Sequence, residues 1–89
     1  MKTRLRIREV AAAKKISRTR LHHDSEVAYG TIRKIFKNPY TEITVTTLSR
    51  LAYAMGAGIH EVIEDVSDEQ YEKEMESIKA KKKPFSPDK

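Results

Sequence analysis

The residues with the clearest chemistry in this sequence are lysines and arginines, which are concentrated in its first half. Residues 1–38 hold eleven of them against three acidic residues, which gives this segment a charge of +8. Residues 39–66 carry a charge of −3. Clustered cations attract polyanions such as nucleic acid or acidic membranes. We therefore expect a polyanion to bind the first half of the chain.

Histidines and nearby carboxylates are a second set that could do chemistry. His22, His23, Asp24 and His60 suggest a metal site, but adjacent histidines point about 100° apart on a helix and do not easily share one ion. We expect no metal and no cofactor. The same four residues with Glu26 could also act as acid and base in a small ribonuclease, although no second catalytic cluster supports this alternative. We expect no enzymatic activity.

Length and composition indicate one compact domain. The chain has 89 residues, 38% hydrophobic and 35% charged, with a net charge of +5. This size excludes a large enzyme, and the absence of cysteine means that apolar burial alone must stabilise the core. The longest apolar run covers residues 10–13, far below the roughly 18 residues of a membrane span. We expect a cytoplasmic protein that does not associate with membranes.

Apolar residues in the first half have the spacing of short helices rather than of a sheet. We expect helices at about 5–14, 18–24 and 28–37. Ser17 is a good N-cap for the second helix. Pro39 ends the third, because the residue before a proline is disfavoured in the helical region.

The second half is ambiguous at residues 40–47, where β-branched residues alternate with others as in a strand. We favour a loop in which Thr44 caps a helix at 45–55, since the apolar residues of that segment form a helical stripe. Gly56 and Gly58 end this helix. A short fifth helix is expected to close the core with Ile59, Val62 and Ile63.

The composition changes after Val66, which divides the chain into a domain at 1–66, a helix at 67–82 and a disordered basic tail at 83–89. Ser67 and Gln70 form a capping box at the start of the helix. Its apolar stripe is thin, so the helix either packs on the domain or pairs with another chain. The stripe consists of Tyr71, Met75 and Ile78.

The predicted second and third helices have the arrangement of a helix-turn-helix. Leu21, Val27, Ile32 and Ile35 follow one another at steps of six, five and three residues, the spacing expected when one helix crosses another through a tight turn. The third helix then presents a basic outer face. A helix presented in this way fits the major groove of DNA.

An ordered set of residues extends through the same region: Ile16, Ser17, Leu21, Val27, Thr31, Ile32, Ile35, Asn38, Thr47, Leu48, Leu51, Ala52, Met55 and Gly56. With this set, the chain resembles the Cro and lambda-repressor-like (Xre-type) helix-turn-helix family over about residues 7–63. The resemblance implies an all-α, five-helix lambda-repressor-like DNA-binding domain, here with a C-terminal helical extension. It also implies that the third helix reads bases while the start of the second binds phosphate.

The resemblance places ten residues at DNA-contacting positions. Arg33 is the best candidate for a guanine contact, because its planar fork matches guanine O6 and N7. Arg18 stands where the family often has a phosphate-binding glutamine, and Lys37 and Asn38 match phosphate-contacting positions. The full set is Arg18, Thr19, Ala28, Tyr29, Gly30, Thr31, Arg33, Lys34, Lys37 and Asn38.

Three residues depart from the family pattern. His22 replaces a small alanine, so either the two helices splay apart or the ring points sideways. Glu26 replaces the usual glycine of the turn, so a left-handed backbone there would be strained unless the turn takes another form. Phe36 occupies a usually polar position and is either a surface anchor or covered by the tail helix.

These observations predict a transcriptional regulator, a repressor, that binds double-stranded DNA sequence-specifically. The family resemblance further implies a homodimer on a palindromic site, because one small recognition helix buries little surface. An alternative is an antitoxin or protein-interaction module that binds a partner through Tyr71, Met75 and Ile78. The basic residues at positions 2, 4, 6 and 8 either enter a minor groove as an arm or decorate the first helix.

Overall fold

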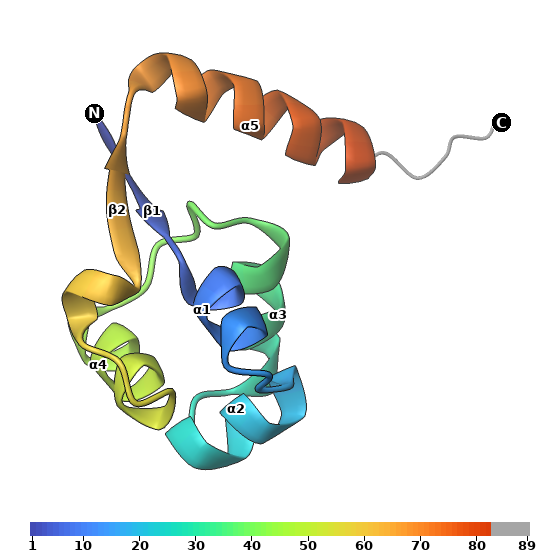
Figure 1. Ribbon diagram of the computed structural model, residues 1–89. Coiled ribbons are helices and arrows are strands. Elements are labelled where there is room, and N and C mark those ends of the chain that lie inside the picture. Colours follow the sequence, from blue (N-terminus) through green and yellow to red (C-terminus); the bar gives the residue numbers. More distant parts are fainter. Residues whose placement is uncertain (83–89) are drawn as a thin grey trace, which may run out of the picture.

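The computed structural model describes residues 1–82, and Figure 1 shows a helical body with a two-stranded sheet and a further helix at one end. The elements are, in order, β1 (Lys2–Leu5), α1 (Ile7–Ala13), α2 (Arg18–Ser25), α3 (Tyr29–Lys37), α4 (Val45–Ala54), a 3₁₀ turn (Ile59–Glu61), β2 (Ile63–Val66) and α5 (Asp68–Lys82). No helix within residues 1–82 combines the length and the apolar content needed to cross a membrane. The predicted disordered tail at 83–89 lies outside the described residues.

The helices begin where the sequence provides caps. The Ser17 hydroxyl accepts a hydrogen bond from the backbone N–H of Arg20 at 3.1 Å, and Thr44 accepts one from Thr47 at 3.1 Å. These bonds satisfy backbone donors that the first turn of a helix leaves unpaired. The predictions for α2, α3 and α4 are confirmed to within one residue at each end, and a loop precedes α4 as expected.

The prediction of an all-α domain is wrong at its two ends. The segment predicted as a fifth helix is instead the 3₁₀ turn followed by β2, which pairs antiparallel with β1 from Lys2 opposite Val66 to Leu5 opposite Ile63. Helix α1 accordingly starts at Ile7 rather than at residue 5. A short apolar run does not distinguish helix from strand by its spacing, and the pairing partner lies at the other end of the domain.

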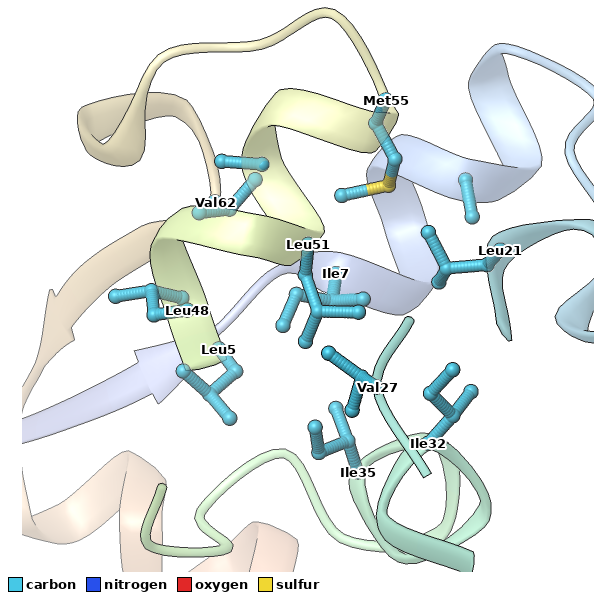
Figure 2. Packing of buried hydrophobic residues seen from close by; sticks show 12 residues of the cluster. Leu5, Ile7, Leu21, Val27, Ile32, Ile35, Leu48, Leu51, Met55 and Val62 are labelled. Atoms are coloured by element: carbon cyan, nitrogen blue, oxygen red, sulfur yellow. The ribbon is translucent and has the colours of Figure 1, made fainter. Parts of the chain in front are cut away.

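An apolar core joins α1 to α4 and the sheet, as Figure 2 shows, and within the described residues α5 contributes none to it. The four residues whose spacing predicted the helix-turn-helix are all buried, with Leu21 and Ile32 fully inaccessible. Val62, from the turn before β2, is buried in the same cluster. The largest fully buried side chains are Ile7, Leu21, Ile32, Ile35, Leu51 and Val62.

The turn between α2 and α3 uses a left-handed backbone at Glu26, where φ is 60°. Its N–H donates to the carbonyl of His22 at 3.0 Å, which ends α2. The His22 ring points sideways, with Nδ1 2.6 Å from the carbonyl oxygen of Val27. The buried Ser25 hydroxyl accepts the Val27 N–H at 3.2 Å. The turn therefore keeps the usual geometry although it lacks the usual glycine.

We expect Glu26→Gly to raise the free energy of unfolding by about 0.5 to 1 kcal/mol, because glycine removes the left-handed strain while adding some entropy to the unfolded chain. Chemical denaturation would measure the change. Glu26→Ala is the control, since alanine has the same Cβ clash in this conformation. An equal gain in both variants would contradict strain as the cause.

Candidate nucleic-acid interface

Helix α3 presents its cations on the face opposite its core contacts. Ile32 and Ile35 are buried with 0% and 2% of their surface exposed, which fixes the rotation of the helix. Arg33, Lys34 and Lys37 are exposed on the other side. None of the three forms an ion pair within residues 1–82. Their charged groups are therefore available to a ligand on a rigid support.

The start of α2 lies close to the end of α3. Arg18 and Thr19 are exposed in the first turn of α2. Arg18 lines the same groove as Lys37 and Asn38, which end α3. The Asn38 side-chain oxygen accepts the N–H of Tyr40 at 2.9 Å, which leaves its amide group as a donor. The structure thus brings the three predicted phosphate ligands together.

The remaining predicted contact residues lie along the first turns of α3. Ala28 and Gly30 are exposed, whereas Tyr29 and Thr31 are half-buried. The Tyr29 ring meets His22 edge-on, with centroids 5.9 Å apart, so the protein partly orients this tyrosine. A Cβ on Gly30 would meet no atom within 4 Å, so packing within the chain does not require glycine there.

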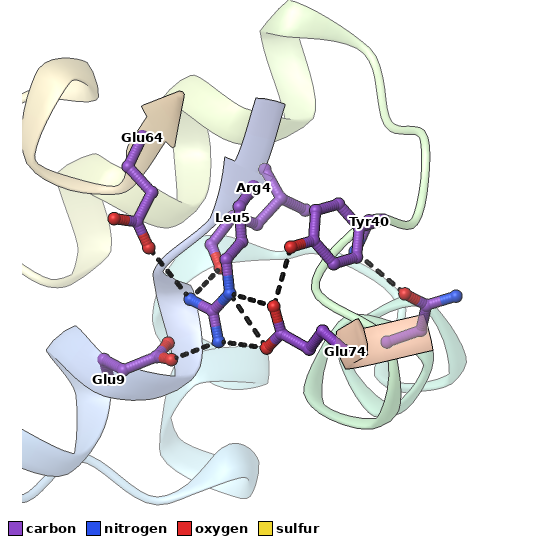
Figure 3. Close-up of polar contacts among 7 residues, drawn as sticks. Arg4, Leu5, Glu9, Tyr40, Glu64 and Glu74 are labelled. Atoms are coloured by element: carbon purple, nitrogen blue, oxygen red, sulfur yellow. Dashed lines mark hydrogen bonds and ion pairs between the residues drawn. The ribbon is translucent and has the colours of Figure 1, made fainter. Parts of the chain in front are cut away.

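Neither alternative for the basic residues at positions 2, 4, 6 and 8 holds for Arg4, which lies in β1 with its guanidinium in a cluster of carboxylates (Figure 3). Its Nη2 is 2.7 Å from Glu9 and 2.9 Å from Glu74, and its Nη1 is 3.2 Å from Glu64. Only 13% of the Arg4 side chain is exposed. The Tyr40 hydroxyl donates to the same Glu74 carboxylate at 2.6 Å. Arg4 therefore joins β1, α1, β2 and α5 instead of reaching out to DNA.

The Arg4–Glu74 pair remains charged at neutral pH. The hydrogen bond from Arg4 lowers the pKa of Glu74, and the bond from Tyr40 lowers it further, against the effect of burial. The same bond to Glu74 raises the pKa of Arg4. Burial, with the bond to Glu74, raises the pKa of Tyr40 to about 12. An ionised Glu74 thus lies between a cation and a neutral phenol.

Helix α5 is held to the body through its first half. Tyr71 packs edge-on against Tyr40 with centroids 4.8 Å apart, and the Lys2 ammonium lies 5.0 Å from the centre of the Tyr71 ring. Together with the Arg4–Glu74 pair, these contacts form what we call the α5 lock. The sequence indicated Tyr71 through its apolar stripe, but it gave no signal for Glu74, whose partner lies 70 residues away.

No group of three metal-binding side chains occurs in the described residues. One nitrogen of His22 is already engaged by the Val27 carbonyl. The exposed Arg and Lys groups and the Asn38 amide of α2 and α3 can bind anions and hydrogen-bond acceptors.

Comparison with known protein families gives a match over most of the chain. A family model described as the Cro/C1-type HTH DNA-binding domain matches residues 6–68. This range contains α1 to α4 and β2, while β1 and all of α5 after its first residue lie outside it. No curated protein and no solved structure matches the chain.

Acid should weaken the docking of α5. Because the folded pKa of Glu74 is depressed, its ionised form stabilises docking above the ordinary glutamate pKa of about 4.3, and this is lost as pH falls through the folded value. NMR of the Tyr40 and Tyr71 ring protons would follow the change. In Glu74→Gln we expect weaker docking at neutral pH and a smaller acid transition. The exposed neighbour Glu72→Gln should behave as wild type, and identical transitions in both variants would contradict this role.

Proposed function

Because this chain belongs to the Cro/C1-type helix-turn-helix DNA-binding domain family, we propose that it is a transcriptional regulator that binds double-stranded DNA sequence-specifically. It places α3 in the major groove, whose width of about 12 Å admits one helix. It binds without catalysing a reaction and acts in the cytoplasm as a repressor, by occupying its site.

The observation that carries this proposal is the exposed face of α3. Gly30, Arg33, Lys34 and Lys37 lie at helical spacing on one side, while buried Ile32 holds the other side to the core. A helix held in this way can present side chains to base edges without further reorganisation. Arg33 is the expected guanine ligand, and such a contact contributes about 1 to 3 kcal/mol of discrimination between bases.

Phosphate binding is assigned to residues beside this face. Arg18 lies at the start of α2, where backbone N–H groups also favour anions, and Lys37 and Asn38 lie across the shared groove. Contacts of this kind position the protein on the duplex and do not read its sequence. They supply the salt-dependent part of the affinity.

We further propose a homodimer on a palindromic operator. A single recognition helix of nine residues buries little surface, so two copies are needed for tight specific binding. The two half-sites would be about 34 Å apart, one turn of the double helix. Selection of bound duplexes from a random pool would reveal such symmetry in the enriched sites.

Affinity for duplex DNA should fall steeply with salt. Each phosphate neutralised by a lysine or arginine contributes a slope of about −0.9 to the logarithm of affinity against the logarithm of salt concentration. Fluorescence anisotropy of a labelled duplex over a range of salt concentrations measures this slope. An affinity that does not change with salt concentration would contradict the proposed phosphate contacts.

Two substitutions should separate base reading from phosphate binding. Arg33→Ala should relax the preference for the selected operator over a scrambled duplex by roughly tenfold, as expected for loss of one base contact. Arg18→Ala should weaken both duplexes alike and reduce the salt slope by about one. Lys73→Ala, which removes an equal charge from exposed α5, is the control. Equal loss of preference in the Arg33 and Arg18 variants would refute the assigned roles.

A further inference from the structure

A groove of about 710 Å³ lies between the second half of α5 and the body of the domain, and we call it the α5 groove. Its apolar lining comes from Phe36, Pro39 and Ile78, and its cationic lining from Arg8, Arg18 and Lys37. In Figure 1, α5 leaves β2 and passes the end of the body that carries α1 and α3. The groove adjoins the proposed DNA-binding residues, because Arg18, Lys37 and Asn38 line it.

The α5 lock determines the position of one wall of this groove. Glu74 is fixed by Arg4, and Ile78 follows it by one helical turn, so both residues lie on the same face of α5. Ile78 and Phe36 are each half-buried and line the groove from opposite elements. Two partly covered apolar side chains held in this way can accept a further apolar side chain.

The charge of the groove is positive. Arg8, Arg18 and Lys37 are exposed and form no ion pair within the described chain. The two acidic residues of the lining, Glu9 and Glu74, both bind the Arg4 guanidinium. One guanidinium balances only one of these two carboxylates, so the four cations and two carboxylates of the lining leave a net charge of +2, and the groove attracts anions.

We propose that the α5 groove binds an acidic amphipathic helix of a partner protein. A helix of this kind inserts apolar side chains into a groove while its flanking carboxylates meet the cations beside it. A DNA backbone would meet the cations but has no apolar group to cover Phe36 and Ile78. A second copy of the chain fits less well, because the Tyr71 of its α5 is already packed against Tyr40.

Binding of the partner excludes DNA. Arg18 and Lys37 belong both to the groove and to the proposed phosphate-binding residues. One guanidinium or ammonium group cannot satisfy a carboxylate and a backbone phosphate at the same time. The partner would thereby release the regulator from its operator. This exclusion rests on the proposed function, whereas binding of the helix goes beyond it and does not require DNA.

Two synthetic peptides of roughly 18 residues, about five helical turns, provide the test. Both carry leucine at i, i+3, i+4 and i+7, and the flanking positions are glutamate in one and lysine in the other. In NMR titrations of the isotope-labelled full chain, the glutamate peptide should shift the amides of Phe36, Lys37 and Ile78, and the lysine peptide should not. Equal binding of both peptides, or shifts confined to other surfaces, would overturn the proposal.

Variants locate the site. Ile78→Ser should lower the affinity for the glutamate peptide at least tenfold. Tyr53→Ser, which removes an exposed aromatic ring from α4, should leave that affinity unchanged. Arg8→Gln should lower the affinity for the glutamate peptide several-fold, because it removes one cation without disturbing the apolar lining. Equal losses in the Ile78 and Tyr53 variants would contradict the site. Self-association that Ile78→Ser abolishes without peptide would instead assign the groove to a second copy.

Competition distinguishes the two proposals. The glutamate peptide should displace a labelled duplex from the full chain in proportion to its occupancy. Simultaneous binding of peptide and duplex would overturn the exclusion. A chain that binds the peptide at the groove but binds no duplex would refute the proposed function and support the docking site.

Discussion

The burial of one face of α3 is the constraint on which the rest of the structure depends. Without disulfides, the domain is stabilised by apolar contacts, and Ile32 and Ile35 anchor α3 in the buried cluster. A helix held by two adjacent turns cannot rotate, so its cations are directed to solvent as a consequence of packing. The left-handed turn at Glu26 serves the same end, because it sets the angle at which α3 leaves α2.

The Arg4 cluster adds a second, polar constraint. One guanidinium connects the first strand to three other elements, and through Glu74 it orients a helix that lies almost wholly outside the matched family domain. The partly buried Arg4 guanidinium is shared by three carboxylates, and among them Glu74 accepts hydrogen bonds from both Arg4 and Tyr40. The position of α5 is therefore set by charge pairing and by the Tyr40–Tyr71 contact rather than by a broad apolar face.

The same cations take part in two proposed interactions. Arg18 and Lys37 adjoin the recognition face on one side and the apolar lining of the α5 groove on the other. A small domain has little surface to divide among ligands. Shared residues allow one ligand to control the binding of another without any change in fold, because the two ligands compete for the same cationic side chains.

The sequence by itself determined the central helices, their caps and the outward cations of α3, because these follow from local spacing and from residues near one another in the chain. Only the tertiary structure decided the β1–β2 sheet, the role of Arg4 and the position of α5. Arg4 lies 60 residues from Glu64 and 70 from Glu74, and Tyr40 lies 34 residues from Glu74. Their pairing depends on where the folded core places the two ends of the domain, so patterns among neighbouring residues in the sequence do not predict it.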